Sequence, residues 1–168
     1  MGKQVSRRRL LQGAAGGVLV SAAGAGAAVL KPAAAGMHVL SNEEMGVVHA
    51  LCEVLFPREP MGISGLDAGV PAEVDRLAAQ WLDDVRRPAF RYVLRGLEWV
   101  TYYSRGRRFS ALPLADRHEV FQTWSDTEVH ARRLAADSLR VVFSMAYFRS
   151  AEVQRAMGYV RLCSGRPT

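Results

Sequence analysis

The chain lacks the short motifs that mark most catalytic and cofactor-binding sites. Its 168 residues contain no P-loop, no C-x-x-C-H haem-attachment motif and no Glu-x-x-His pair of the kind that holds iron in helical bundles. The segment Gly24-Ala25-Gly26 follows no strand pattern, and "GISGL" (62–66) lacks the last glycine of a nucleophile elbow. These absences predict a chain with no catalytic residues and with no cofactor or metal of its own.

Cysteine and histidine, the common ligands of structural metals, are scarce. His49, Cys52 and Glu53 stand about one helical turn apart, which is a possible ligand spacing. The same spacing fits a Cys52 that faces the core between two flanking polar residues, and we favour that interpretation. The second cysteine, Cys163, lies near the C-terminal end. In an oxidising compartment the two cysteines can bond to each other, or Cys52 can be packing while Cys163 tethers another chain.

Acidic residues are missing from the first 35 positions, and lysine is missing from all later ones. Five of the 22 basic residues and none of the 16 acidic residues lie in positions 1–35. The whole chain has a net charge of +6, but the remainder has a net charge of only +1. The basic character therefore belongs mostly to the N-terminal segment, and it does not indicate a nucleic-acid partner.

The N-terminal segment resembles a twin-arginine export signal, which directs folded proteins across a bacterial membrane. An arginine pair precedes an apolar run that extends to Leu30, carries no charge and contains five glycines. Glycine weakens both helix propensity and apolar character, and such a weak run suits twin-arginine export better than general secretion. The residues that match the signal pattern are Ser6, Arg7, Arg8, Leu10 and Leu11.

Two fates of this segment follow from the sequence. The small residues at 33–35 predict cleavage between Ala35 and Gly36. Alternatively, the 21 residues from Leu10 to Leu30 reach about 30 Å as a helix, which is enough for a retained membrane anchor. The sequence thus divides into a signal segment at 1–35 and a single domain at 36–168, a length that suits one core.

Helical periodicity dominates the domain, and no strand alternation stands out. Ser41 and Glu44 form a capping-box pattern that opens a first helix, and Pro57 stops it. Val74, Leu77, Ala78, Trp81, Leu82 and Val85 follow at helical spacing from Pro71, up to the break at Arg87-Pro88. Further helices are predicted over 88–104, 114–124, 126–148 and 150–157, the last capped by Ser150. The prediction is an all-α bundle of about six helices, preceded by a signal or anchor helix.

Two predicted helices carry more apolar surface than a small core requires. The helix over 88–104 has a second apolar face, and "VVFSMAYF" (141–148) is apolar all round. A helix that is apolar on two faces lies between two layers, either within its own fold or against a partner. The basic loop that follows 88–104 is either solvated or part of a docking surface. The predicted partner interface consists of Tyr92, Trp99, Tyr103, Arg105, Arg107 and Arg108.

Four segments resemble, in order and spacing, the gluconate 2-dehydrogenase subunit 3 family: "LSNEEMGVVHALCEVLFP", "GLDAGVPAEVDRLAAQWL", "RGRRFSALPLADRHEVFQTW" and "YFRSAEVQRAMGY". The resemblance extends from about Leu40 to Tyr159 and includes the leader. It implies a non-catalytic small subunit of a large flavoprotein of the glucose-methanol-choline type, which carries FAD and oxidises an alcohol, sugar or sterol hydroxyl. It also implies a cytochrome subunit with haem c as a possible electron acceptor, and a cysteine bond to the large subunit, for which Cys163 is the better candidate.

The expected function is therefore escort and stabilisation of that flavoprotein during export by the twin-arginine translocase. The expected location is the periplasm, either free or attached to the inner membrane through the N-terminal segment. Two other functions remain open at this point. One is an independent periplasmic helical domain that binds a small molecule or lipid, and the other is an enzyme in its own right.

Overall fold

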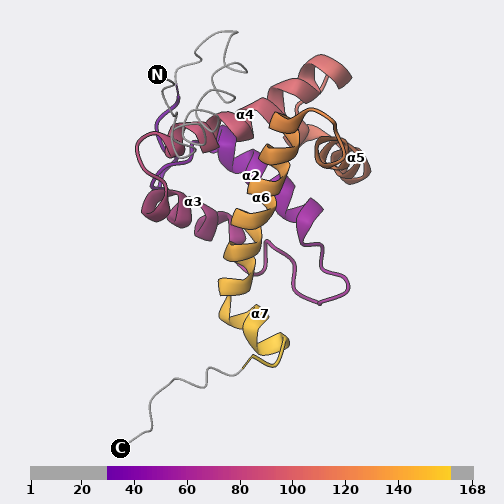
Figure 1. Cartoon of the computed structure of the whole chain (residues 1–168). Helices are drawn as coiled ribbons and strands as arrows, with labels where there is room; N and C mark the ends of the chain where they lie inside the picture. Colours follow the sequence, from indigo (N-terminus) through magenta and orange to yellow (C-terminus); the bar gives the residue numbers. More distant parts are fainter. Residues whose placement is uncertain (1–29, 160–168) are drawn as a thin grey trace, which may run out of the picture.

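The structure, a computed structural model, describes residues 30–159, and within them it contains helices and no strand (Figure 1). The predicted all-α bundle of about six helices is confirmed. The export-signal residues from Ser6 to Leu11, together with Cys163, lie outside the described residues. The elements are α2 (Asn42–Leu55), α3 (Val70–Trp81), α4 (Arg86–Arg105), the 3₁₀ helix η1 (Phe109–Ala111), α5 (Leu114–Ser125), α6 (His130–Arg149) and α7 (Ala151–Ala156).

The central helix is α2, which contacts α3, α4, α5, α6 and η1 and is crossed by α6 in Figure 1. The predicted capping box fixes its start. The Glu44 amide donates to the Ser41 hydroxyl at 3.5 Å, and the Ser41 amide donates to the Glu44 carboxylate at 2.9 Å. The predicted apolar stripe then faces the core, where Val47, Val48 and Leu51 are almost completely buried.

The boundary between α3 and α4 differs from the sequence prediction. Helical spacing continued to residue 85, but α3 ends at Trp81, and both Trp81 and Val85 are exposed. The Asp83 carboxylate accepts hydrogen bonds from the amides of Val85 and Arg86 at 3.1 and 2.7 Å, and thereby starts α4. An aspartate that can bond local amides thus interrupts a pattern that its apolar neighbours would have continued.

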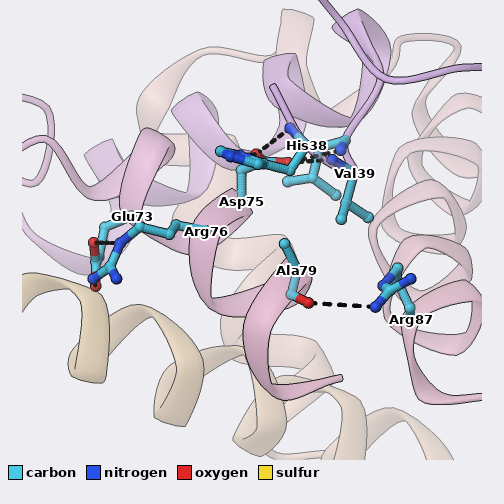
Figure 2. Close-up of polar contacts among 8 residues, drawn as sticks. His38, Val39, Glu73, Asp75, Arg76, Ala79 and Arg87 are labelled. Atoms are coloured by element: carbon cyan, nitrogen blue, oxygen red, sulfur yellow. Dashed lines mark hydrogen bonds and ion pairs between the residues drawn. The ribbon is translucent and has the colours of Figure 1, made fainter. Parts of the chain in front are cut away.

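The C-terminal end of α3 is stabilised by a residue of α4. Arg87 donates to the carbonyl of Leu82 at 2.9 Å and to that of Ala79 at 3.3 Å, and Figure 2 shows the second of these bonds. The last carbonyls of a helix have no partner within it, and a cation near them also interacts favourably with the helix dipole. Arg87 therefore joins α3 to α4.

The loop between α2 and α3 returns to the end of α2 through Gly65. A Cβ at this position would lie 3.2 Å from the Cβ atoms of Cys52 and Phe56, so only glycine fits without movement of its neighbours. The Phe56 ring stacks on that of Tyr147 in α6 at 4.3 Å, and the Tyr147 hydroxyl donates to the Ile63 carbonyl at 2.7 Å. This loop is thus bound to both α2 and α6.

The C-terminal helices also depart from prediction in detail. Helix α6 begins at His130 rather than at residue 126, and Ser150 separates it from α7. Ser150 occupies the N-cap position of α7, but its side chain makes no cap hydrogen bond, so the predicted cap is wrong. Of the helices between Asn42 and Ala156, none has the length and apolar character needed to cross a membrane.

Candidate partner-binding surface

Helix α4 has one face in the core and an opposite face with exposed aromatic rings. Leu94, Leu97 and Thr101 are completely buried against the rest of the domain. On the other face the exposed fractions are 42% for Tyr92 and Trp99, 47% for Tyr102 and 82% for Tyr103. We call these four residues the α4 aromatic surface. The second apolar face predicted from sequence therefore exists, and residues 30–159 do not cover it.

Three rings of this surface contact one another. Trp99 meets Tyr102 edge to face at 5.9 Å between ring centroids, and Tyr102 meets Tyr103 in the same way at 5.9 Å. Trp99 and Tyr103 are tilted against each other at 6.3 Å. Such edge-to-face pairs are a favourable arrangement of aromatic rings, and they restrict ring motion. Tyr102 was absent from the predicted interface, although its spacing of three residues from Trp99 was a usable signal.

Gly96 lies one turn before Trp99, in the middle of α4. A Cβ at this position would have no heavy atom within 4 Å, apart from those of its chain neighbours and its own helix backbone. Glycine in a helix interior costs about 0.5–1 kcal/mol relative to alanine. Packing within the described residues does not explain why glycine occupies this position, since the space beside Gly96 is open.

The loop after α4 is fixed by hydrogen bonds to a buried residue of α4. Gly106 ends the helix with a φ of 70°, in the left-handed region that glycine adopts readily. The buried Glu98 carboxylate accepts from the Ser110 amide at 2.9 Å and from the Ser110 hydroxyl at 2.6 Å. Phe109, which follows the arginines of this loop, is completely buried. These contacts fix the loop against α4.

The three arginines of the predicted interface have different environments. Arg105 forms ion pairs with Glu119 at 2.9 Å and Asp116 at 3.8 Å on α5, so its charge is already engaged within the domain. Arg108 lies over the Trp99 ring, with its Cζ 5.7 Å from the centroid, which is a cation–π distance. Arg107 is exposed. The structure thus brings Arg108 to the α4 aromatic surface and turns Arg105 toward α5.

The other unusually apolar segment, 141–148 of α6, is buried on one face only. Phe143, Ala146 and Tyr147 belong to the core, whereas Val141 and Phe148 are 58% and 47% exposed. The sequence predicted that such an apolar segment lies between two layers, and residues 30–159 cover only part of it. Its exposed residues stand apart in sequence, and the Phe148 ring meets the buried Tyr147 edge to face at 5.4 Å rather than another exposed ring.

Cys52 and its neighbours do not converge on a metal site. Cys52 is completely buried and unpaired, and desolvation raises the pKa of its thiol to about 12. His49 is exposed, and Glu53 pairs with Arg117 of α5. Across residues 30–159, no group of three or more His, Cys, Asp or Glu residues is placed to hold a metal ion. Cys52 therefore acts as a small core residue, as the favoured interpretation expected.

The hollows of the domain are small or open. The cavity beneath Trp99 and Arg108 measures about 20 Å³, far below the roughly 300–1,000 Å³ of small-molecule sites. A groove of about 400 Å³ lies between α3, α6 and α7. It is crossed by the ion pairs that Glu73 makes with Arg76 and Arg149 at 2.5 and 2.9 Å. Neither hollow is an enclosed apolar pocket.

Residues 42–160 match the family model of gluconate 2-dehydrogenase subunit 3. The chain belongs to this family. The matched range of the subunit 3 domain covers every helix from α2 to α7, and so it contains the whole α4 aromatic surface. The family resemblance inferred from the four sequence segments is confirmed. No curated protein and no solved structure matches the chain.

Membership in the subunit 3 family gives the function in coarse form. The family is that of a small subunit of a dehydrogenase, so this chain is an accessory subunit associated with a larger dehydrogenase complex. An accessory subunit needs a surface that binds the rest of its complex. Among the residues that the structure describes, the α4 aromatic surface has the most concentrated set of exposed rings.

Proposed function

We propose that this chain is a non-catalytic subunit that escorts a large FAD-dependent dehydrogenase through twin-arginine export to the periplasm. It binds and stabilises the folded flavoprotein, which oxidises an alcohol, sugar or sterol hydroxyl. The large subunit docks on the α4 aromatic surface. The observation that carries the proposal is this exposed cluster of rings in a chain of a dehydrogenase-subunit family.

The composition of the surface supports a protein partner. Tyrosine, tryptophan and arginine are enriched at protein interfaces, where they supply most of the binding energy. Trp99, Tyr102 and Tyr103 form such a cluster, with Arg108 over the Trp99 ring. A small-molecule or lipid carrier would instead need an enclosed apolar cavity, and the cavity beneath these residues is only about 20 Å³.

Gly96 supports close approach of that partner. Its position beside Trp99 has open space and no internal neighbour that would exclude a methyl group. A helix position that lacks a side chain lets another backbone or ring approach the helix closely. The cost of glycine within α4 is then offset in the complex rather than in the free subunit.

A pull-down with the full-length chain tests the docking surface. The unmodified chain should recover a large subunit that shows flavin absorbance. Trp99→Ala should weaken this complex about 30-fold or more, because truncated interface tryptophans often cost 2 kcal/mol or more. Trp81→Ala is the matched control, since Trp81 is a tryptophan of similar exposure on α3. Equal effects of both substitutions would exclude the α4 aromatic surface as the docking site.

A second experiment tests the export role separately. Arg7→Lys combined with Arg8→Lys should leave both this chain and its flavoprotein in the cytoplasm, as measured by cell fractionation and immunoblotting. Trp99→Ala should instead permit export of the small subunit and reduce export of the large one. Normal periplasmic delivery of the flavoprotein by the double-arginine variant would contradict shared export. A haem c subunit as electron acceptor stays a prediction. A Cys163 bond to the large subunit also stays a prediction, because Cys163 lies outside the described residues.

A further inference from the structure

The segment that precedes α2 is bound to the domain on both sides of the predicted cleavage bond. On its N-terminal side, the Lys31 ammonium pairs with Glu43 at 2.6 Å. The Lys31 carbonyl also accepts from the Arg91 guanidinium of α4 at 2.5 Å. The Ala34 amide donates to the Leu40 carbonyl at 2.8 Å. Residues that a cleavage after Ala35 would remove are therefore part of the domain's hydrogen-bond network.

On the C-terminal side, a buried carboxylate holds the chain. Asp75 of α3 accepts hydrogen bonds from the amides of His38 and Val39 at 2.6 and 2.9 Å (Figure 2). It also accepts one from the Leu40 amide at 2.8 Å. The His38 Nδ1 atom lies 3.0 Å from the same carboxylate. The Asp75 side chain is only 1% exposed. Burial alone would raise the pKa of Asp75, but the three amides and His38 outweigh it and lower the pKa. Asp75 is therefore ionised at neutral pH, and its hydrogen bonds are charge-assisted.

The predicted cleavage bond itself lies inside a turn. The Met37 amide donates to the Ala34 carbonyl at 3.0 Å, so Ala34 to Met37 form a β-turn with the Ala35–Gly36 peptide at its centre. Gly36 has a φ of 79°, which is the conformation that a type II turn requires of its third residue. Ala35 and Gly36 are both exposed. A protease can therefore reach the Ala35–Gly36 bond, but the backbone there is closed into a turn, and this conformation is the obstacle to cleavage.

We propose that the Ala35–Gly36 bond is protected in the folded chain, and that Lys31–Ala35 stay attached to the mature domain. Proteolysis of a folded segment proceeds through a locally opened state, and its rate follows the population of that state. Opening this turn breaks the hydrogen bond from the Ala34 amide to the Leu40 carbonyl. The bonds of Asp75 to the three amides that follow the turn oppose the same movement. A processing site, if used, then lies before Lys31. The proposal rests on the proposed function in one respect, namely that twin-arginine export presents the chain already folded.

Signal peptidase and purified full-length protein in detergent provide the test, with mass spectrometry of the products. A synthetic peptide of residues 22–42 should be cleaved between Ala35 and Gly36. Cleavage of the folded chain at that bond should be slower than cleavage of the peptide by a factor of about ten or more, since an opening cost of about 1.4 kcal/mol gives a factor of ten. Cleavage of the folded chain at the peptide's rate would overturn the proposal. An uncleaved peptide would also overturn it, because the fold would then not be the cause of protection.

Asp75→Asn identifies the residue that holds the segment. The asparagine amide cannot accept all the hydrogen bonds of the carboxylate, so cleavage after Ala35 should rise toward the rate of the peptide. Glu73→Gln is the matched control on α3, because Glu73 bonds Arg76 and Arg149 and not this segment. Equal cleavage of both variants would contradict the role of Asp75.

Hydrogen exchange keeps the test decisive if Asp75→Asn fails to fold. The amides of Met37 to Leu40 in the unmodified chain should exchange much more slowly than in the peptide, and exchange at the peptide's rate would overturn the proposal. Neither assay uses the flavoprotein or the translocase. Failure of the pull-down would therefore leave this proposal standing, and failure here would leave the docking proposal standing.

Discussion

Two aromatic clusters of the molecule are built from similar residues in opposite surroundings. In the inner cluster, Tyr147 stacks on Phe56, its hydroxyl is bonded to the Ile63 carbonyl, and Gly65 lies tightly against the base of Phe56. In the outer cluster, Trp99 and its neighbours contact one another and solvent, and Gly96 has no contact that requires glycine. The inner cluster is explained by the fold alone, whereas for the outer one we propose a partner. Substitutions in the two clusters should therefore affect different measurements.

The largest effect on the free chain is expected at Tyr147. Tyr147→Ala should lower the free energy of unfolding by about 3 kcal/mol or more, because it leaves a cavity under Phe56 and an unpaired Ile63 carbonyl. Chemical denaturation of the chain alone measures this, and Trp99→Ala under the same conditions should cost only about 1 kcal/mol, the contribution of its ring contacts. A similar loss for both would mean that Trp99 is a core residue and would remove the contrast between the clusters.

A smaller loss is expected at the inner glycine. Gly65→Ala should destabilise the chain by about 1–3 kcal/mol, because the added methyl would lie 3.2 Å from the Cβ atoms of Cys52 and Phe56. Thermal unfolding should show a lower midpoint for the variant. An unchanged midpoint would show that the loop moves away from α2 at no cost.

The smallest effect, and one of opposite sign, is expected at the outer glycine. Gly96→Ala should stabilise the free chain by about 0.5–1 kcal/mol, since alanine favours the helix and finds open space. In the complex the same methyl should obstruct the large subunit and reduce its recovery in the pull-down. A variant that is more stable and also binds normally would show that the partner does not approach α4 at this point.

The parts of the fold that depend on neighbouring residues could be predicted from sequence. The capping box of Ser41 and Glu44 and the stop before Pro57 place α2 closely. The second face of α4 also follows from spacing, because Tyr92, Gly96, Trp99 and Tyr103 recur every three or four positions. Whether that face meets the chain's own core or a partner depends on how many other helices reach it. Periodicity within one helix gives no information about those other helices.

The features that escaped prediction depend on polar side chains whose partners cannot be identified from a single sequence. Trp81 fits the stripe of α3, but Asp83 and Arg87 end the helix before that stripe continues. Arg105 has the same charge as Arg107 and Arg108, yet it turns toward Glu119 on a helix that follows it. Asp75 bonds amides more than 30 residues away, and no motif marks it. A single sequence shows that such side chains are polar, but it does not show which group each one bonds.

The bonds between Glu98 and Ser110 have a consequence for the kinetics of assembly. These hydrogen bonds fix the loop that carries Arg108 before any partner binds. The contacts among the three rings of the outer cluster likewise restrict the motion of those rings. A surface that is already ordered loses little side-chain and loop entropy on association. Complex formation then resembles the docking of two rigid bodies, whose rate is limited by diffusion and mutual orientation rather than by a folding step.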